Sequence, residues 1–360
     1  MKLLIVEDDK ATIQSYEDNI ESFNKTTECK IIAIIKENIE TAKEALISPE
    51  YDAAIVDLKL SSNTTELEGI EIVNDIYNKL RFPLFIVSGS IGQIQHEENA
   101  FLKKRSRDGN FKTILSEIVA IYDTGITKIL GKSGLINDYL NKIFWNHLAN
   151  SLDLWISDKS RNSEDKQKSL LRYTLLHIQE YLEIAKDSEF HDYHPAEIYI
   201  TPCIKENLFT GDIVIEHNNL NKYIVLSPSC DMAQNKAKDI LLVSIEDCES
   251  GIMNEKVNVI KKNTAENTII EESKSIVQSL ICNSYSNKYH FLPLYKDIKA
   301  GLINFQKLKS VRVRDFSGNY QRIASINSNF TKDIVARFSY YYSRQGSPDF
   351  NLDEIYKSLF

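Results

Sequence analysis

Three short apolar runs near the start of the chain each end in a polar residue, and this pattern limits the possible folds more than any other feature. The runs are too short for typical helices and are separated by helix-like segments, which favours strands of a parallel sheet that is covered on both faces. In such a sheet the carboxyl ends of the strands lie along one edge, where ligands bind. The runs, each with the residue that follows it, are 2–6 with Glu7, 53–56 with Asp57, and 83–87 with Ser88.

The segments between these runs complete an alternating α/β pattern. Helical periodicity covers residues 10–22, 38–46 and 70–80, and a further apolar strand is expected at 30–35. Strands that alternate with helices predict a doubly wound, five-stranded parallel sheet. We therefore expect one α/β domain over residues 1–130.

The rest of the chain changes character twice. Residues 131–190 are mainly helical and are expected to form a linker or a dimerisation segment, so a homodimer is one expected assembly. Residues 191–360 contain short apolar strands separated by turn residues, with a few helical stretches. This second pattern predicts a mostly β, barrel-like α+β output domain.

Composition narrows the classes of partner. The net charge is −8, and residues 195–360 are close to neutral, so nucleic-acid binding is conceivable but gains no support from a basic cluster. No apolar run approaches the ~20 residues that span a bilayer, and the acidic start does not resemble a signal peptide. Five scattered cysteines without a C-x-x-C pair are typical of reduced thiols, so we expect a cytoplasmic protein that does not bind membranes.

The polar strand ends suggest a specific chemistry. Carboxylates that lie close together repel one another unless a cation neutralises them, and Mg²⁺ prefers such hard oxygen ligands. A carboxylate in that setting can attack a phosphoryl donor and form an acyl phosphate. The sequence therefore predicts a magnesium-dependent phosphoryl site around Glu7, Asp8 and Asp57.

The same residues resemble the receiver domain of two-component response regulators. The resemblance implies a flavodoxin-like fold and a histidine kinase as phosphodonor. By this resemblance Asp57 is the phospho-acceptor, Asp8 and Glu7 are Mg²⁺ ligands, and Ser88 is the switch hydroxyl. The matching segments are 4–9, 54–60, Gly69 and 85–89.

Two further site positions follow from the resemblance. The carbonyl of Lys59 is implied as a main-chain metal ligand, and a lysine at the end of the fifth strand is implied as Lys104, with Lys103 as the alternative. The interval from Ser88 to Lys104 is shorter than the family's, and Arg105 stands where a proline is usual. The helix before the fifth strand is therefore expected to be short or irregular, and the output face to be remodelled.

The output domain offers weaker signals. Residues 210–214, 223–231 and 241–245 faintly resemble the small β-barrel of the PemK/MazF toxin endoribonucleases, without their arginine in an obvious place. Cys230 and Asp231 form a tentative output site, as a nucleophile beside a carboxylate. The competing interpretation is a turn in which Asp231 caps the next segment and Cys230 is a small buried apolar residue.

Three functions fit these features. The leading one is a response regulator that is phosphorylated on Asp57 and switches a non-classical output domain. The second is a receiver-controlled effector enzyme, nuclease-like, in stress or phage defence. The third is a phosphate sink or adaptor whose C-terminal half binds only protein. Whether the output domain is an enzyme is left open by the sequence.

Overall fold

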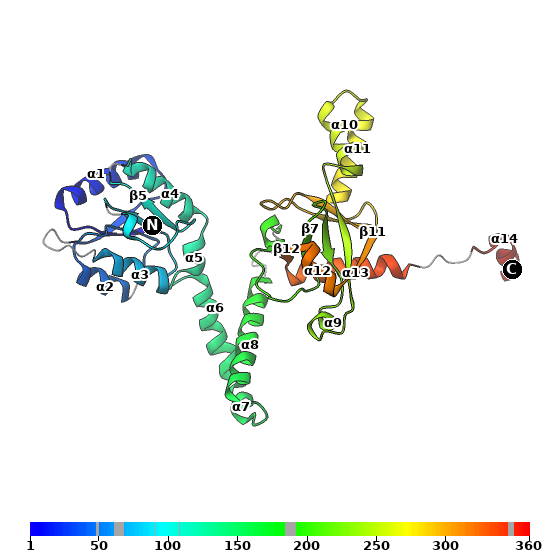
Figure 1. Cartoon of the computed structure of the whole chain (residues 1–360), viewed down its shortest axis with the longest axis horizontal. Helices are drawn as coiled ribbons and strands as arrows, with labels where there is room; N and C mark the ends of the chain where they lie inside the picture. The colour runs from blue at the N-terminus through cyan, green and yellow to red at the C-terminus, as the bar shows by residue number, and fades with distance from the viewer. Residues whose placement is uncertain (48–49, 61–67, 90, 108, 184–191, 345–348) are drawn as a thin grey trace. The chain divides into compact units, whose positions relative to one another are not determined.

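The structure is a computed structural model that describes residues 1–47, 50–60, 68–89, 91–107, 109–183, 192–344 and 349–360. The chain divides into two compact units, Met1–Glu189 and Phe190–Phe360. Figure 1 shows the first in blue to green and the second in green to red, and each is described here by itself.

The first unit contains the predicted parallel sheet. Its strand order is β2-β1-β3-β4-β5, and every neighbouring pair is parallel. This order, with its reversal at β1, is that of flavodoxin-like doubly wound folds. The prediction of the fold is therefore confirmed. The strands are β1 (Lys2–Val6), β2 (Ile32–Lys36), β3 (Ala53–Val56), β4 (Leu84–Val87) and β5 (Leu102–Arg105).

Helices cover both faces of this sheet, which explains why its strands are continuously apolar. One face packs against α1 (Lys10–Thr26) and α4 (Phe111–Asp123), where the rings of Tyr16 and Phe111 stack 4.1 Å apart. The other face packs against α2 (Ile39–Ile47) and α3 (Gly69–Lys79).

The connection between β4 and β5 departs from a regular α/β repeat. Its described residues contain a single 3₁₀ turn, η1 (Ile91–Gln93), in place of a full helix. Ile94 follows this turn and packs into the core on the α2 and α3 face. The short interval between Ser88 and Lys104 had predicted such an irregular helix.

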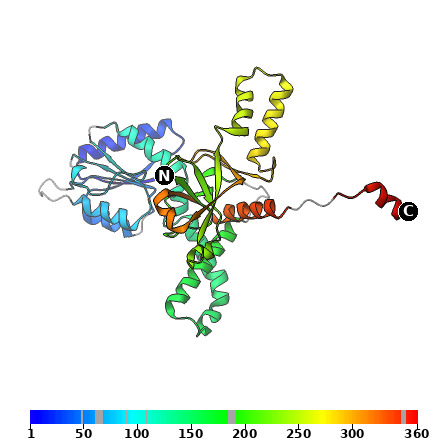
Figure 2. The same cartoon turned by 45° about the vertical axis from the view of Figure 1, so that its right-hand side comes forward.

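A helical segment follows α4 within the first unit. It consists of α5 (Ile126–Leu130), α6 (Leu135–Ile143), the π-helical segment η2 (Phe144–Leu148), α7 (Ala149–Ser157) and α8 (Ser163–Glu183). α6, η2 and α7 run on as one helix, and α8 returns beside it, as Figures 1 and 2 show. Arg81 Nε donates a hydrogen bond to the Leu130 carbonyl (2.9 Å), which connects α5 to the sheet domain.

The second unit is built on a curled antiparallel sheet of order β10-β11-β9-β8-β7-β12-β6. A mostly β C-terminal domain was predicted, and the sheet confirms it. The strands are β6 (Tyr199–Ile200), β7 (Asp212–Glu216), β8 (Lys222–Val225), β9 (Asp239–Asp247), β10 (Tyr289–Leu292), β11 (Gly301–Arg312) and β12 (Tyr320–Ile326).

Apolar clusters lie on both sides of this curled sheet. On one side α13 (Ser328–Ser343) packs Ile334 and Phe338 against Phe305 of β11. On the other side Phe316 of α12 (Val313–Asn319) stacks on Tyr320 at 5.2 Å. The remaining helices are α9 (Ser229–Ala233), α10 (Gly251–Lys262), α11 (Asn267–Ile281) and α14 (Leu352–Leu359).

The second unit also differs from the sequence prediction in detail. From the sequence, a strand is expected only at 310–313 and no helix at 251–262, whereas β11 runs from Gly301 to Arg312 and α10 spans Gly251–Lys262. The polar residues Gln306, Lys307 and Lys309 interrupt the apolar pattern of β11, close to the point where its pairing with β9 shifts register. No helix in the described part of the chain is long and apolar enough to cross a membrane.

Candidate functional site

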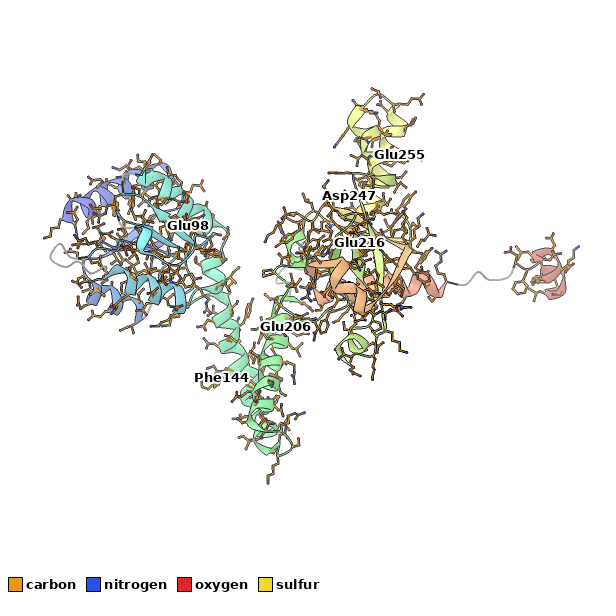
Figure 3. All side chains as sticks on the ribbon, in the orientation of Figure 1. Glu98, Phe144, Glu206, Glu216, Asp247 and Glu255 are labelled. Carbon is orange, nitrogen blue, oxygen red and sulfur yellow. The ribbon has the colours of Figure 1, made fainter. Side chains whose placement is uncertain are left out.

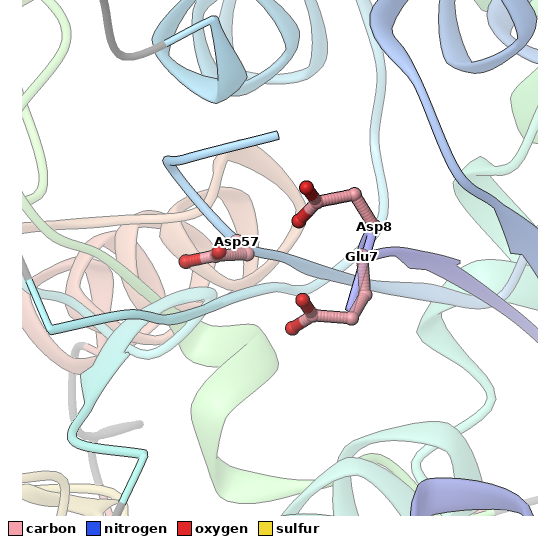
Figure 4. A group of neighbouring side chains, drawn as sticks. All are labelled: Glu7, Asp8 and Asp57. Carbon is pink, nitrogen blue, oxygen red and sulfur yellow. The ribbon is translucent and has the colours of Figure 1, made fainter. Parts of the chain in front are cut away.

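Three carboxylates meet at the carboxyl edge of the parallel sheet. Glu7 and Asp8 follow β1, and Asp57 follows the neighbouring β3. One oxygen from each lies within 4.8 Å of the other two, and Figure 4 shows the three side chains gathered together. The sequence had predicted that these residues lie together, because the carboxyl ends of parallel strands share one edge of the sheet.

Glu7 is almost completely buried in this cluster of carboxylates, which we call the acidic pocket. Its side chain is 1% exposed, and its carboxylate accepts a hydrogen bond from the N–H of Asp9 at 3.2 Å. Burial raises the pKa of Glu7 to about 7; the charge on Asp57 adds to the effect, and the charge on Arg107 counters it. A buried carboxyl with a raised pKa indicates a site that is short of positive charge.

The backbone holds Asp57 rigidly beside Glu7. Its N–H donates to the Val6 carbonyl at 2.9 Å, and its Oδ1 accepts the N–H of Leu58 at 2.8 Å. Gly69, at the start of α3, packs so closely that a Cβ there would lie 2.1 Å from the Asp57 carbonyl oxygen. The position therefore requires glycine because the helix start touches the backbone of the site.

Arg107 supplies a cation that the sequence analysis did not single out. Its Nη2 contacts both oxygens of Glu7, at 3.1 and 3.3 Å, and forms an ion pair with Asp57 Oδ2. Arg107 lies two residues after the end of β5. Because the carboxyl ends of parallel strands share one edge, this position was the signal that could have identified Arg107 from the sequence. Arg107 pairs with two of the three clustered carboxylates, so the cluster keeps an excess of negative charge, and its oxygen ligands fit a hard divalent cation.

Lys104, predicted as the site cation, does not contact the carboxylates. Its Nζ donates to the Ile94 carbonyl at 3.0 Å, and its N–H donates to Glu98 Oε1 at 2.8 Å. Side chains alternate along a strand, and Lys104 therefore shares a face with Leu102, which packs in the core beside α2 and α3. Lys103 lies one position earlier in β5, level with Phe85.

The other predicted site residues lie at the same edge. Ser88 follows β4 and is 2% exposed, and its N–H donates to the Arg105 carbonyl at 3.3 Å. Lys59 follows the buried Leu58 and has an exposed side chain, which suits a position that contributes only its carbonyl. Part of the loop after Lys59, residues 61–67, lies outside the described residues.

The tentative output site consists of two neighbouring residues on α9. Cys230 is exposed, and its Sγ lies 3.7 Å from Asp231 Oδ1. The Asp231 carbonyl accepts the N–H groups of Lys236 and Ala237, and so the residue also shapes the turn after α9.

A second polar cluster in this unit escaped the sequence analysis. Glu216, labelled in Figure 3, accepts hydrogen bonds from Lys309 Nζ at 2.6 Å and from the hydroxyl of Tyr320 at 3.1 Å. The bond from Lys309 holds the pKa of Glu216 down at about 2. These residues line an open hollow of about 400 Å³ together with Arg312. The strands that form the cluster are far apart in the sequence, so no local pattern marks it.

The solved structures that we compare with the chain each cover about a third of it. No protein-family model matches the chain, and no curated protein does. A CheY-like response regulator receiver domain from Methylobacillus flagellatus is 20% identical over 33% of this chain and 98% of its own, with a TM-score of 0.26.

Two further solved structures are similar in the same region. A CheY-like receiver domain protein from Methanospirillum hungatei is 19% identical over 34% of this chain and 94% of its own, with a TM-score of 0.26. The signal receiver domain of a putative Luxo repressor protein from Vibrio parahaemolyticus is 17% identical over 33% and 87%, with a TM-score of 0.26. By its strand order, the sheet domain of the first unit has the flavodoxin-like doubly wound fold, which response-regulator receiver domains share.

Proposed function

We propose that the first unit is a phosphorylation switch in which Asp57 accepts a phosphoryl group. The observation that carries the proposal is the ion pair of Arg107 with both Glu7 and Asp57, beside Asp8, at the carboxyl edge of the sheet. This arrangement supports the proposal, because a carboxylate that can act as a nucleophile lies beside two further carboxylates and a guanidinium.

The reaction transfers a phosphoryl group from a phosphohistidine of a histidine kinase. An oxygen of Asp57 attacks the phosphorus, the P–N bond breaks as the new O–P bond forms, and the imidazole leaves with the electron pair of the broken bond. Mg²⁺, held by Asp8, Asp57, Glu7 and the Lys59 carbonyl, would neutralise charge on the phosphoryl oxygens. Low-molecular-weight acyl phosphates can serve as donors by the same displacement.

Arg107 is the residue we propose to bind the phosphoryl oxygens, in the role that the sequence analysis gave to Lys104. A guanidinium donates two parallel hydrogen bonds to an oxyanion, whereas an ammonium acts as a point charge. Phosphorylation of Asp57 would exchange the present ion pair for one with the phosphoryl group. Ser88, at the end of the adjacent β4, is the hydroxyl proposed to turn toward that group.

We propose that phosphorylation changes the affinity with which the rest of the chain binds its partners. A switch shifts a population only if the two states differ in affinity for a partner. The hollow beside Glu216 and Lys309 gives the second unit a clustered polar surface, which supports an output domain with a ligand of its own over a plain phosphate sink. An effector enzyme controlled by the receiver is the alternative.

Fluorine NMR with beryllofluoride tests this proposal. Beryllofluoride adds to a carboxylate as a stable mimic of a phosphoryl group, and we expect a bound ¹⁹F signal only when Mg²⁺ is present. Asp57→Asn should abolish the signal, and Asp52→Asn, on an aspartate outside the pocket, should leave it unchanged. A bound signal that survives Asp57→Asn would refute the assignment of the acceptor.

A further inference from the structure

The helical segment of the first unit forms an antiparallel hairpin with an aromatic seam. The rings of Tyr139 and Tyr181 stack 5.4 Å apart near one end, and those of Trp155 and Tyr173 meet edge to face at 5.8 Å near the other. Between them, His147 Nε2 hydrogen bonds to the hydroxyl of Tyr181 at 2.8 Å. This seam joins the helix made of α6, η2 and α7 to α8.

Each helix carries a second apolar row beside the seam, and most side chains of these rows are exposed to solvent, whereas Leu148 and Ile178 are half-buried. We call the two rows together the outer stripe. Leu152 is 52% exposed, Leu171 61% and Leu182 68%, and Phe144, labelled in Figure 3, is 56% exposed. The outer stripe consists of Leu140, Phe144, Leu148, Leu152 and Ile156 on the first helix and Leu171, Leu175, Ile178 and Leu182 on α8.

Both rows lie on the same side of the hairpin. In each helix the outer row follows the seam row by one residue, as Leu140 follows Tyr139 and Leu182 follows Tyr181, which is a turn of about 100° around the axis. The two helices are antiparallel, so the same sense of rotation brings both rows to one side. The wider turn of η2 keeps residues four apart aligned along the first helix.

We infer that the outer stripe is a dimerisation surface that packs against the same stripe of a second copy of this chain. The apolar face of each helix, seam and outer rows together, has the width that a helix presents to the core of a bundle. A two-helix hairpin covers only half of that face. Packing two hairpins stripe to stripe gives a four-helix bundle, in which all four faces are covered.

The size and chemistry of the outer stripe fit a second copy. Six of its side chains are more than half exposed. At roughly 100 Å² of exposed surface each they offer about 600 Å², and flanking residues complete the ~800 Å² per partner of a standard interface. The stripe contains no charged residue, so a charge on the partner would be buried without a counter-charge, and an uncharged stripe fits best. A two-fold symmetric contact of the stripe with itself meets that requirement.

The chain offers matched variants on both helices. Leu175→Glu places a charge in the outer stripe of α8, and Leu176→Glu places the same charge on the neighbouring residue, which faces away and is equally exposed (56% and 62%). On α7, Leu152→Glu and Leu154→Glu form a second such pair, at 52% and 73% exposure. All four side chains are exposed in the single chain, so none of the changes removes its core.

Sedimentation equilibrium of the full-length chain, from 0.5 to 100 µM, tests the inference. We expect a species of twice the 41.3 kDa chain mass. Leu175→Glu and Leu152→Glu should raise the dissociation constant at least 100-fold, and Leu176→Glu and Leu154→Glu should change it less than threefold. Circular dichroism confirms that each variant is folded.

Three results would overturn the inference. One is a wild-type chain that stays monomeric at 100 µM, because the stripe would then be covered within the chain or by another protein. The second is equal weakening by both members of each pair. The third is a dimer that none of the four substitutions affects. The test does not involve Asp57, so its failure leaves the phosphorylation proposal standing.

Discussion

At the scale of single residues, the carboxylates of the acidic pocket repel one another, and the charge of Arg107 counters this repulsion. Glu7 and Asp57 are almost completely buried, and only Arg107 offsets their charge among the described side chains. Burial of like charges in such a pocket is costly unless a cation compensates it. The charge balance of the acidic pocket therefore depends on Arg107 and on the protonation of Glu7.

Replacing Arg107 should slow phosphorylation and leave the fold intact. Loss of a hydrogen-bonding charged partner costs about 1.5–3 kcal/mol, so Arg107→Ala should slow acyl phosphate formation roughly ten- to hundredfold, and Arg107→Lys should recover part of the rate. Stopped-flow or mass measurements with acetyl phosphate give the rate.

Arg105→Ala serves as the control for Arg107. Arg105 pairs with Glu98 and Glu117 and does not contact the carboxylate pocket. An equal loss of rate in both variants would mean that Arg107 acts through general electrostatics and not by contact with the phosphoryl group.

Glu7 should make the metal-free protein less stable as the pH rises. Its pKa is raised to about 7, so between its ordinary value and 7 the folded state holds a proton that the unfolded state releases. The free energy of unfolding therefore falls as pH rises through this window and levels off above it. Thermal melts in EDTA should show this decline, and Mg²⁺ or Glu7→Gln should remove it; a flat profile in the wild type contradicts the prediction.

At the scale of elements, the start of α3 fixes the backbone of the site. Gly69→Ala would place a methyl group 2.1 Å from the Asp57 carbonyl oxygen and 2.7 Å from Leu58 Cα, and backbone must move to admit it. We expect a loss of about 2 kcal/mol or more in unfolding free energy and weaker Mg²⁺ binding by calorimetry.

Gly92→Ala is the matched change for Gly69→Ala. Gly92 lies in η1, on the connection between β4 and β5, and a Cβ there would meet no atom within 4 Å. It should leave the metal affinity within twofold of the wild type. If both variants behave alike, the close approach of α3 to Asp57 does not set the geometry of the site.

β10 and α13 hold a buried histidine that should make the second unit sensitive to acid. His290 is 6% exposed, and burial lowers its pKa to about 4, although the charge of Asp333, 3.8 Å away, acts in the opposite direction. The unfolded chain binds a proton at higher pH than the folded one, so stability falls as pH drops from about 6.5 to 4.

Hydrogen exchange at β10 and β11 measures this effect of His290. We expect faster exchange of these amides at pH 5 than at pH 7, after correction for intrinsic rates, and no such difference in His290→Phe. The exposed His217 provides the control, since His217→Asn should keep the wild-type profile. Persistence of the acid effect in His290→Phe would assign it to another group.

The sequence predicted elements well where a local pattern sets them. β1, β3 and β4 are apolar runs, and their polar ends predicted the positions of Glu7 and Asp57 because strand ends share an edge. The cation was not predictable in the same way. Whether Lys104 or Arg107 reaches the pocket depends on where β5 ends and on which face each side chain takes.

At the scale of the whole molecule, the strand pairing of the first unit is easier to predict from the sequence than that of the second unit. The sheet of the first unit joins strands in simple α/β succession, whereas the second unit pairs β7 with β12 and β9 with β11, across long separations in sequence. Glu216 and Lys309 meet only through that pairing.

The central claim, that Asp57 is a phosphoryl acceptor, is tested most directly by the intact mass of the full-length chain after incubation with acetyl phosphate. The account predicts a gain of one phosphoryl group that needs Mg²⁺, is lost on treatment with hydroxylamine, and is absent from Asp57→Ala. A folded protein that gains no mass with Mg²⁺ present, or an Asp57→Ala variant that gains as much as the wild type, would contradict it.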